Sequence, residues 1–395
     1  MSNDYIFTSE SVTRGHPDKV CDQVSDAIID KFLRQDPDAR VIAECAVSSG
    51  ILFISTHFAT SASNLDISDI ARRTIRDIGY PKDMFDAEDC TILTSTMDHS
   101  TRDYRAIDLD SMTDRQIDTI TARQQTSVFG YACDHTIDLM PLPIWLAHRF
   151  AQRMDTTRVA KKLPYLLPDA EIQVGFRFSD NRPENLHSIT VVATQDEKSD
   201  VGLQDLRQDI IDVVIKPVLK QEKITAADDT IFNINPDGLR KGGGPSVHSG
   251  LTGRKTGIDT YGGYARSSGA ALSGKDPMRI DRVGAYIARF AAKNVVAAGL
   301  ARECEVQLSY SIGCAQPVSI HVRTFGSSEL DEAAITDRLK QVIDFRPGGV
   351  VRHLGLKTLS TGDSGFYHKL ATYGHMGRSD LDVPWESTEL ASKLK

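Results

Sequence analysis

The sequence lacks several features that would assign it to a specialised class. Its six cysteines are scattered and no two of them form a Cys-x-x-Cys pair, so neither a zinc site nor a disulfide framework is indicated. No apolar run approaches the roughly eighteen residues of a membrane span, and the first residues show no basic and apolar leader pattern. We therefore expect a cytoplasmic protein with no membrane partner.

An excess of positive charge is also missing. The formal net charge is −8 at pH 7, whereas a protein that binds a nucleic-acid groove normally carries a basic excess, so we expect no nucleic-acid partner. Two glycine-rich nucleotide signatures, GxxxxGK[ST] and GxGxxG after a strand, are absent too. Any nucleotide site in this chain must use another arrangement.

Glycine and cations are instead concentrated in one stretch, residues 241–276. It holds ten of the 28 glycines together with five cations, Lys241, Arg254, Lys255, Arg266 and Lys275. Glycine permits close backbone approach, successive amides can form an anion-binding concavity, and Lys and Arg bind phosphate oxygens. A flexible linker is the alternative, but linkers lack regular cations and interleaved large apolar residues. The stretch predicts a polyphosphate site.

The order helix, hairpin, helix occurs three times along the chain. Apolar periodicity predicts the following helices and hairpins: helices at 16–34, 64–79, 143–154, 203–214, 283–298 and 331–345, and hairpins at 41–59, 172–194 and 305–326. We predict an α+β fold of three similar domains in a pseudo-threefold arrangement, each with helices on one face of a mostly antiparallel sheet. The repeat rests on element order alone, and coincidence is the alternative.

The predicted domains have the boundaries 1–102, 129–232 and 233–395. Between the first two, residues 103–128 belong to a polar stretch without a steady period, which predicts a mobile loop that covers the active site. The tail from Ser379 onward is expected at the surface. In the first helix, Asp22, Asp26 and Asp30 are predicted to form the solvent-facing side.

Two short motifs carry side chains suited to phosphate chemistry. GHPDK places His16 and Asp18 at the start of the first predicted helix, where anions are favoured. SGKDPMRIDRV places Lys275 near Asp281, and a carboxylate among phosphate-binding cations suits Mg²⁺. The alternative for Asp281 is a helix N-cap, and the two roles are compatible.

These motifs stand in a colinear series that runs from about residue 6 to about residue 385. The series is FTSESVTRGHPDKVCDQVSDAI, FGYACD with LMP, GLTGRKTGIDTYGG, SGKD, AAKNVVAAGLA, QLSYSIGCAQP and YGHMGR. It resembles the methionine adenosyltransferases, also called S-adenosylmethionine synthases. The resemblance implies formation of S-adenosylmethionine from ATP and L-methionine with release of phosphate and diphosphate, in a homodimer or homotetramer whose active sites lie between subunits.

The resemblance also implies roles for individual residues. The catalytic residues would be His16, Lys275 and Arg254. The ATP site would contain His16, Asp169, Arg254, Lys255, Ala271, Lys275 and Arg279. Mg²⁺ would be held by Asp18 and Asp281 with Glu10 nearby, and K⁺ by Glu44.

Four positions that would face the amino acid depart from the family pattern. Where the family usually has acids or glutamine, this chain has His57, His99, Gln124 and His248. Three hypotheses follow besides ordinary methionine: a thioether that lacks or modifies the α-amine, convergence of the three histidines on a transition metal, and a nucleotide-binding regulatory paralogue with little catalysis. Further departures are Glu171 and the pair Leu239-Arg240.

Overall fold

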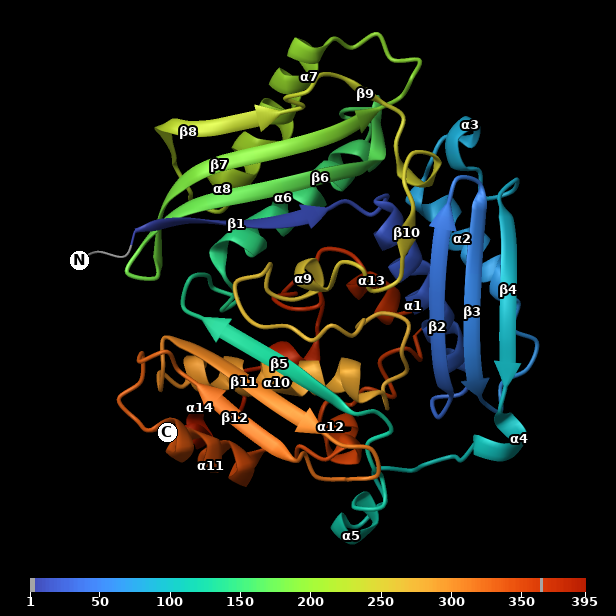
Figure 1. Cartoon of the computed structure of the whole chain (residues 1–395), viewed down its shortest axis with the longest axis vertical. Helices are drawn as coiled ribbons and strands as arrows, with labels where there is room; N and C mark the ends of the chain where they lie inside the picture. The colour runs from blue at the N-terminus through green and yellow to red at the C-terminus, as the bar shows by residue number, and fades with distance from the viewer. Residues whose placement is uncertain (1–3, 363–364) are drawn as a thin grey trace.

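Three sheets surround a centre filled by helices and by the glycine-rich stretch (Figure 1). The computed structural model describes residues 4–362 and 365–395. The predicted α+β class with three similar parts is confirmed. Within the described ranges, no helix is long and apolar enough to cross a membrane.

The first sheet has the strand order β10-β2-β3-β4. Its strands are β2 (Arg40–Ser48), β3 (Ile51–Ala59), β4 (Thr91–Asp98) and β10 (Gly250–Leu251). The predicted hairpin is β2 with β3, and β4 adds to it in parallel orientation. Helix α1 (Pro17–Gln35) packs against β2, and α2 (Ile67–Ile78) packs against α1. Among the residues that the structure describes, the other face of this sheet exposes Ile51, Phe53, Leu93 and Met97, and we call it the uncovered face.

The second sheet has the order β1-β6-β7-β8, with β9 also paired to β7. Its strands are β1 (Tyr5–Val12), β6 (Leu166–Ser179), β7 (Arg182–Gln195), β8 (Ala226–Ile234) and β9 (Arg240–Lys241). Helix α6 (Leu142–Val159) packs against β1 and β6. A helical run made of α7 (Leu203–Asp209), a π-helical turn (Ile210–Ile215) and α8 (Lys216–Gln221) packs against α6 and shares one hydrophobic core with the sheet.

The third sheet has the order β12-β11-β5. Its elements are β5 (Thr126–Cys133), β11 (Glu303–Tyr310), β12 (Ser319–Arg323), α10 (Ile280–Ala297), α11 (Glu332–Val342) and α12 (Pro347–His353). The remaining short helices are α3 (Lys82–Phe85), α4 (Ser100–Asp103), α5 (Asp114–Ile117), α9 (Thr256–Asp259), α13 (Tyr367–Leu370), α14 (Ala391–Leu394) and two 3₁₀ turns (Gly244–Ser246 and Pro384–Glu386).

Each sheet takes one strand from another third of the chain. β1 pairs with β6, β5 pairs with β11, and β10 pairs with β2. These exchanges tie the three parts together, and they bring the glycine-rich stretch against the first sheet and α1. The residue boundaries given above for the domains stay a prediction.

The C-terminal tail is part of the core, so the prediction that it lies at the surface is wrong. Trp385 is fully buried and stacks on Tyr286 with 3.7 Å between ring centroids. Glu386 accepts hydrogen bonds from Arg289 and Lys293 of α10. Two buried cations on α10 need a carboxylate, and the tail provides it.

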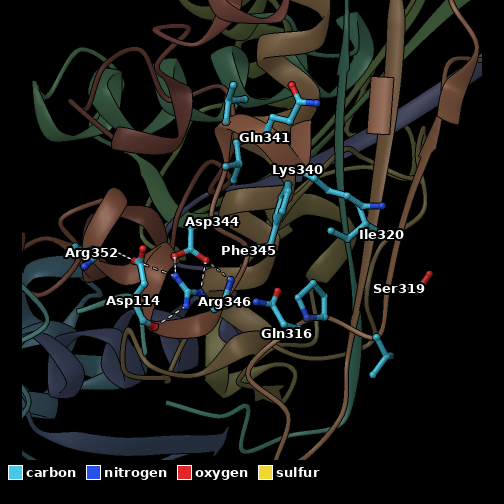
Figure 2. A pocket seen from close by; sticks show the side chains of 14 residues that line it. Asp114, Gln316, Ser319, Ile320, Lys340, Gln341, Asp344, Phe345, Arg346 and Arg352 are labelled. Carbon is cyan, nitrogen blue, oxygen red and sulfur yellow. Dashed lines mark hydrogen bonds and ion pairs between the residues drawn. The ribbon is translucent and has the colours of Figure 1, made fainter. Parts of the chain in front are cut away.

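The predicted mobile loop has more structure than its polar sequence indicated. Leu109 and Ile117 are buried, and α5 is held by Arg346, whose guanidinium lies 2.9 Å from Asp118 and 2.7 Å from Asp344. Figure 2 shows Arg346 with Asp114 and Asp344 beside a groove of about 710 Å³. Residues around α5 are therefore docked on the third part, and a covering role stays a prediction.

Candidate active site

The N-terminus of α1 is capped by His16. The His16 backbone is extended, Pro17 occupies the first helical position, and His16 Nδ1 accepts a hydrogen bond of 3.2 Å from the backbone N–H of Asp18. Proline suits this position because its fixed φ is helical and its missing N–H would have had no partner in the helix. The His16 ring is thereby fixed at the mouth of the helix, as GHPDK predicted.

His16 is a neutral hydrogen-bond donor in this position. Burial lowers the pKa of His16 to about 4, an effect that the nearby Asp169 carboxylate only partly opposes. Because Nδ1 accepts from Asp18 N–H, the single ring proton is assigned to Nε2. Nε2 lies 3.8 Å from a carboxylate oxygen of Glu171 across the opening. The ring can therefore donate to an oxyanion without itself carrying charge.

Three carboxylates of α1 hold the glycine-rich stretch in place. We call Asp18, Asp22 and Asp26 the acidic stripe, since their spacing of four puts them on one face of the helix. Each accepts one backbone N–H of the stretch, with distances of 3.0 Å to Leu251 N, 2.8 Å to Gly253 N and 2.8 Å to Gly274 N respectively. The stripe thus sets the course of the stretch past the helix mouth.

The prediction that Asp22, Asp26 and Asp30 face solvent is wrong. All three are buried, at 0%, 0% and 2% exposed, because the glycine-rich stretch and α13 cover that side of α1. Buried carboxylates need countercharges. Lys19 Nζ lies 2.9 Å from Asp22, and Arg282 Nη2 lies 2.5 Å from Asp26. The regular spacing of these aspartates is visible in the sequence. Amphipathicity alone assigned them to the solvent-facing side of α1, although they face the interior.

Glycine is required where the stretch meets the helix mouth. A Cβ at Gly250 would lie 2.1 Å from the carbonyl carbon of Pro17, and Gly253 has φ +77° with an added Cβ only 2.2 Å from the Ala271 Cβ. A side chain at Gly250 would force the backbones apart, and one at Gly253 would also be strained. The glycines therefore bring backbone amides close to His16 and Asp18.

Two cations of the stretch flank Asp18. Lys255 Nζ is 3.4 Å from Asp18 Oδ2, and Arg254 Nε is 3.9 Å from Asp18 Oδ1. The Asp18 carboxylate is buried, whereas both cations remain partly exposed. One carboxylate with two cations and a neutral imidazole forms a cradle in which an anionic chain and a divalent metal can bind together.

Lys275 and Asp281 form a second cluster at the start of α10. Lys275 Nζ donates to Ala271 O at 2.6 Å and lies 3.1 Å from Asp281 Oδ2. Burial lowers the pKa of Lys275, although Asp281 opposes the shift. The N-cap of α10 is Arg279, so Asp281 is not the cap but lies in the first turn.

Gln124 connects the end of the docked loop to this cluster. Its Nε2 donates to Asp281 Oδ2 at 2.8 Å, and its Oε1 accepts from the backbone N–H of Ile280 at 3.2 Å. A carboxylate at this position could accept from Ile280 but could not donate to Asp281. The amide is therefore matched to its neighbours.

Asp169 and His248 form a further part of the site, on β6 and the glycine-rich stretch. Asp169 Oδ2 accepts from Gly244 N at 2.7 Å and lies 3.1 Å from His248 Nε2. The hydrogen bond to Asp169 raises the pKa of His248. Both line a groove of about 270 Å³ with Arg240. Its mixture of donors, acceptors and apolar side chains suits a nucleoside.

A second groove, of about 430 Å³, lies on the uncovered face of the first sheet. Glu44, His57, His99 and Arg279 line it, and the rings of His57 and His99 stack at 5.9 Å between centroids. Arg40 and Arg123 line it as well, and our sequence reasoning named neither. One begins a strand and the other lies in a polar loop, so no local pattern marked them. Glu10 lies elsewhere, on β1, 3.1 Å from Gln173.

The three histidines do not converge, so the transition-metal hypothesis is wrong for the residues of one chain. His248 pairs with Asp169 and lies 5.1 Å from the His16 ring, whereas His57 and His99 line the other groove. Within residues 4–362 and 365–395, no group of three or more potential ligands could hold a metal ion. On β3, His57 is paired with Ile42 of β2, and both residues line the groove on the first sheet.

Comparison with known proteins shows the family to which the chain belongs. Three domain descriptions match in order: S-adenosylmethionine synthetase N-terminal domain at 4–101, central domain at 119–239 and C-terminal domain at 242–387. The S-adenosylmethionine synthase of Crocosphaera subtropica is 44% identical over all of this chain and 98% of its own length. That of Trichodesmium erythraeum is 42% identical over all of this chain and 97% of its own length. The chain belongs to the S-adenosylmethionine synthetase family.

Proposed function

We propose that this protein forms S-adenosylmethionine from ATP and L-methionine and releases phosphate and diphosphate. The observation that carries the proposal is the cradle of His16, Asp18, Arg254 and Lys255 at the mouth of α1, in a chain related over its full length to S-adenosylmethionine synthases. The protein is therefore a methionine adenosyltransferase that acts, we infer, in the cytoplasm.

The reaction needs alignment and charge stabilisation rather than a general base. A lone pair of the thioether sulfur attacks C5′ of ATP, the C5′–O bond breaks, and its electron pair leaves on the triphosphate. The sulfur becomes a sulfonium and no proton moves in this step. Hydrolysis of the released triphosphate by water then gives phosphate and diphosphate. His16 Nε2–H is a neutral donor at a buried position, which suits an oxygen that gains charge only in the transition state.

The cations that would bind phosphate belong to two groups, one in the cradle at the mouth of α1 and one in the cluster at the start of α10. Arg254 and Lys255 would hold triphosphate oxygens beside His16, and Lys275 would hold others from the α10 side with Arg279. The backbone carbonyl of Ala271 fixes Lys275. Asp169, in its groove beside His248, would contact the nucleoside.

Two carboxylates, those of Asp18 and Asp281, could each offer one oxygen to Mg²⁺. Asp18 uses one oxygen for Leu251 N–H, and Asp281 uses one for Lys275 and Gln124, so each keeps an oxygen for a metal. Mg²⁺ usually takes one or two protein carboxylates and completes its shell with phosphates and water, and it would neutralise triphosphate charge. Glu10 would lie beside the metals. The exposed carboxylate of Glu44 would hold K⁺.

We further propose a homodimer, or a tetramer built from it, with active sites completed between subunits. The uncovered face of the first sheet exposes Ile51, Phe53, Leu93 and Met97 at 49%, 42%, 49% and 51%, and neighbouring exposed apolar residues of this kind mark interaction surfaces. Light scattering should give at least twice the chain mass. A mixture of His16→Asn and Lys275→Ala chains should regain activity if one site uses both chains, and no gain would refute shared sites.

The decisive test is turnover. Protein incubated with ATP, Mg²⁺, K⁺ and methionine should yield a sulfonium product by mass spectrometry together with phosphate and diphosphate. ATP binding without product, with methionine or any other thioether, would refute the proposal in favour of a regulatory nucleotide-binding paralogue.

A further inference from the structure

Lys19 is a buried cation with two carboxylate partners. It follows Asp18 directly on α1, yet its side chain is fully buried. Its ammonium donates to Asp22 Oδ2 at 2.9 Å and to Asp259 Oδ1 in a close contact. Asp22 lies on α1, whereas Asp259 is the last residue of α9 and belongs to the glycine-rich stretch. One ammonium therefore joins α1 to α9 inside the protein.

The two carboxylates hold the glycine-rich stretch on either side of the cradle cations. Asp22 uses its other oxygen, Oδ1, to accept the backbone N–H of Gly253 at 2.8 Å, immediately before Arg254 and Lys255. Asp259 lies four residues after Lys255, and its backbone N–H donates to Lys255 O at 2.9 Å. Because Lys255 is the N-cap of α9 and Asp259 is its last residue, a fixed Asp259 also fixes the turn that carries Lys255.

The side chains of the cradle cations are not held firmly by their own contacts. Arg254 and Lys255 are partly exposed, and their carboxylate partner Asp18 lies 3.9 Å and 3.4 Å away respectively. Ordering a chain segment and its long side chains costs conformational entropy, and a ligand that must meet this cost on binding has a lower affinity. The position of both cations therefore depends on how well the backbone beneath them is held.

The charges of this group favour a positioning role. We call Lys19, Asp22 and Asp259 the buried triad, since all three are fully buried. It holds two carboxylates and one ammonium, and a buried carboxylate without its own countercharge is costly. Within residues 4–362 and 365–395, Asp259 Oδ2 has no hydrogen-bond partner, so the carboxylate is held through Oδ1 by Lys19. A single pair of Lys19 and Asp22 would balance the charge, and the second carboxylate is explained by its hold on α9.

We propose that Asp259, held by Lys19, is a positioning residue that fixes α9 so that Arg254 and Lys255 are in place at the mouth of α1 before the triphosphate binds. The inference rests on the proposed function and deepens it. Lys19 and Asp259 are buried, so they act through the two cations, and the transfer step is unchanged. Cations that are already in place bind a polyanion more tightly and stabilise the charge that develops on the leaving oxygen.

The test measures the Kd of inorganic triphosphate in the presence of Mg²⁺, by calorimetry on the full-length protein in its native assembly. Asp259→Ala leaves the balanced pair of Lys19 and Asp22, so it creates no unpaired buried charge. We expect it to weaken the Kd by at least tenfold, or about 1.4 kcal/mol. Asp259→Asn keeps an oxygen that can accept from Lys19 and should weaken the Kd less, by about threefold to tenfold.

Thr260→Val is the matched control. Thr260 follows Asp259 and is also buried, but its hydroxyl donates to Thr256 O at 2.8 Å, which is a contact within α9. Its Kd for triphosphate should stay within about threefold of the parent value. Thermal unfolding shows which variants are folded. If Asp259→Ala does not fold, Asp259→Asn decides the matter: a Kd weaker by about threefold or more supports the inference, and an unchanged Kd overturns it.

Turnover adds a measurement that a general loss of stability would not reproduce. With ATP, Mg²⁺, K⁺ and methionine, Asp259→Ala should lower kcat/KM for ATP by at least tenfold and keep the KM for methionine within about threefold. The inference is overturned, and the proposed function left intact, by an unchanged triphosphate Kd in Asp259→Ala, an equal loss in Thr260→Val or in Asp259→Asn, or a parallel rise in the KM for methionine. A parent protein that binds no triphosphate and forms no sulfonium defeats the proposed function instead.

Discussion

Replacement of His16 separates its two roles, helix cap and hydrogen-bond donor. The ring caps α1 through Nδ1 and presents Nε2–H to the opening. Asn is a good N-cap residue but cannot place a donor where Nε2 lies, whereas Ala provides neither group. We expect both variants to lose about 10²–10³ in kcat, or about 2.7–4 kcal/mol, as when one donor to a developing oxyanion is removed. Folding stability is a separate quantity, and only His16→Ala should lower it, by about 0.5–2 kcal/mol, because this variant removes the cap.

The assay measures kcat by phosphate release at saturating ATP and methionine, and stability by urea unfolding, for both variants. Because burial lowers the pKa of His16 to about 4, the ring is less than about 1% protonated at pH 6.5, and kcat should show no ionisation of His16 between pH 6 and 8. A kcat for His16→Asn within a factor of three of the parent would refute the donor role. A pH limb near 6.5 that disappears in His16→Asn would refute the neutral ring.

Three further changes test the site and the core. Gly250→Ala should destabilise the protein by about 1–3 kcal/mol, because its Cβ would meet Pro17 at 2.1 Å. Gly257→Ala is the control in thermal unfolding, since a Cβ there would have nothing within 4 Å. Equal unfolding midpoints for the two variants would contradict the close approach of Gly250 to Pro17. Asp18→Asn should lower kcat, and the defect should ease as Mg²⁺ is raised in the turnover assay; indifference to Mg²⁺ would remove Asp18 from the metal site. Trp385→Ala should cost about 3–5 kcal/mol in urea unfolding, and a cost below 1 kcal/mol or so would show that the tail is not part of the core.

Acid stability offers an additional test of the His16 environment. A histidine whose pKa is lowered by folding stays neutral in the native state, so the unfolded chain takes up the proton first as pH falls below 6.5. Its contribution to stability is therefore lost between pH 6.5 and about 4, and the difference corresponds to about 3 kcal/mol. In His16→Asn this part of the acid sensitivity should vanish from unfolding curves measured across that range. Equal acid sensitivity in both proteins would contradict the lowered pKa.

Local patterns predicted the elements whose signal lies within one segment. Val20, Val24, Ile28 and Phe32 recur every four residues and are all buried in α1, and the hairpin of β2 and β3 followed from two β-rich runs around Gly50. The three exchanged strands escaped prediction for the opposite reason. β10 has only two residues and pairs with a strand some two hundred positions earlier, so its existence depends on tertiary contacts.

The same distinction applies to the site. His16 and Asp18 stand within one short motif at a helix start, and the structure keeps them together at the mouth of α1. The groove on the first sheet combines a strand, a loop and a helix start that are far apart in sequence, so Arg40 and Arg123 carried no signal. A cluster of charges formed by elements that are far apart in sequence can be recognised only when the positions of all these elements are known.

The acidic stripe resolves an apparent conflict at the proposed polyphosphate site, where carboxylates should repel the ligand. Asp22 and Asp26 are each paired with a buried cation, Lys19 and Arg282, so their charges are compensated inside the protein. Asp18 is the member of the stripe next to the partly exposed cations Arg254 and Lys255 at the opening. Two aspartates therefore act on the backbone of the glycine-rich stretch. In the proposed function, the carboxylate of the stripe that would meet the triphosphate is that of Asp18, which would share a divalent metal with it.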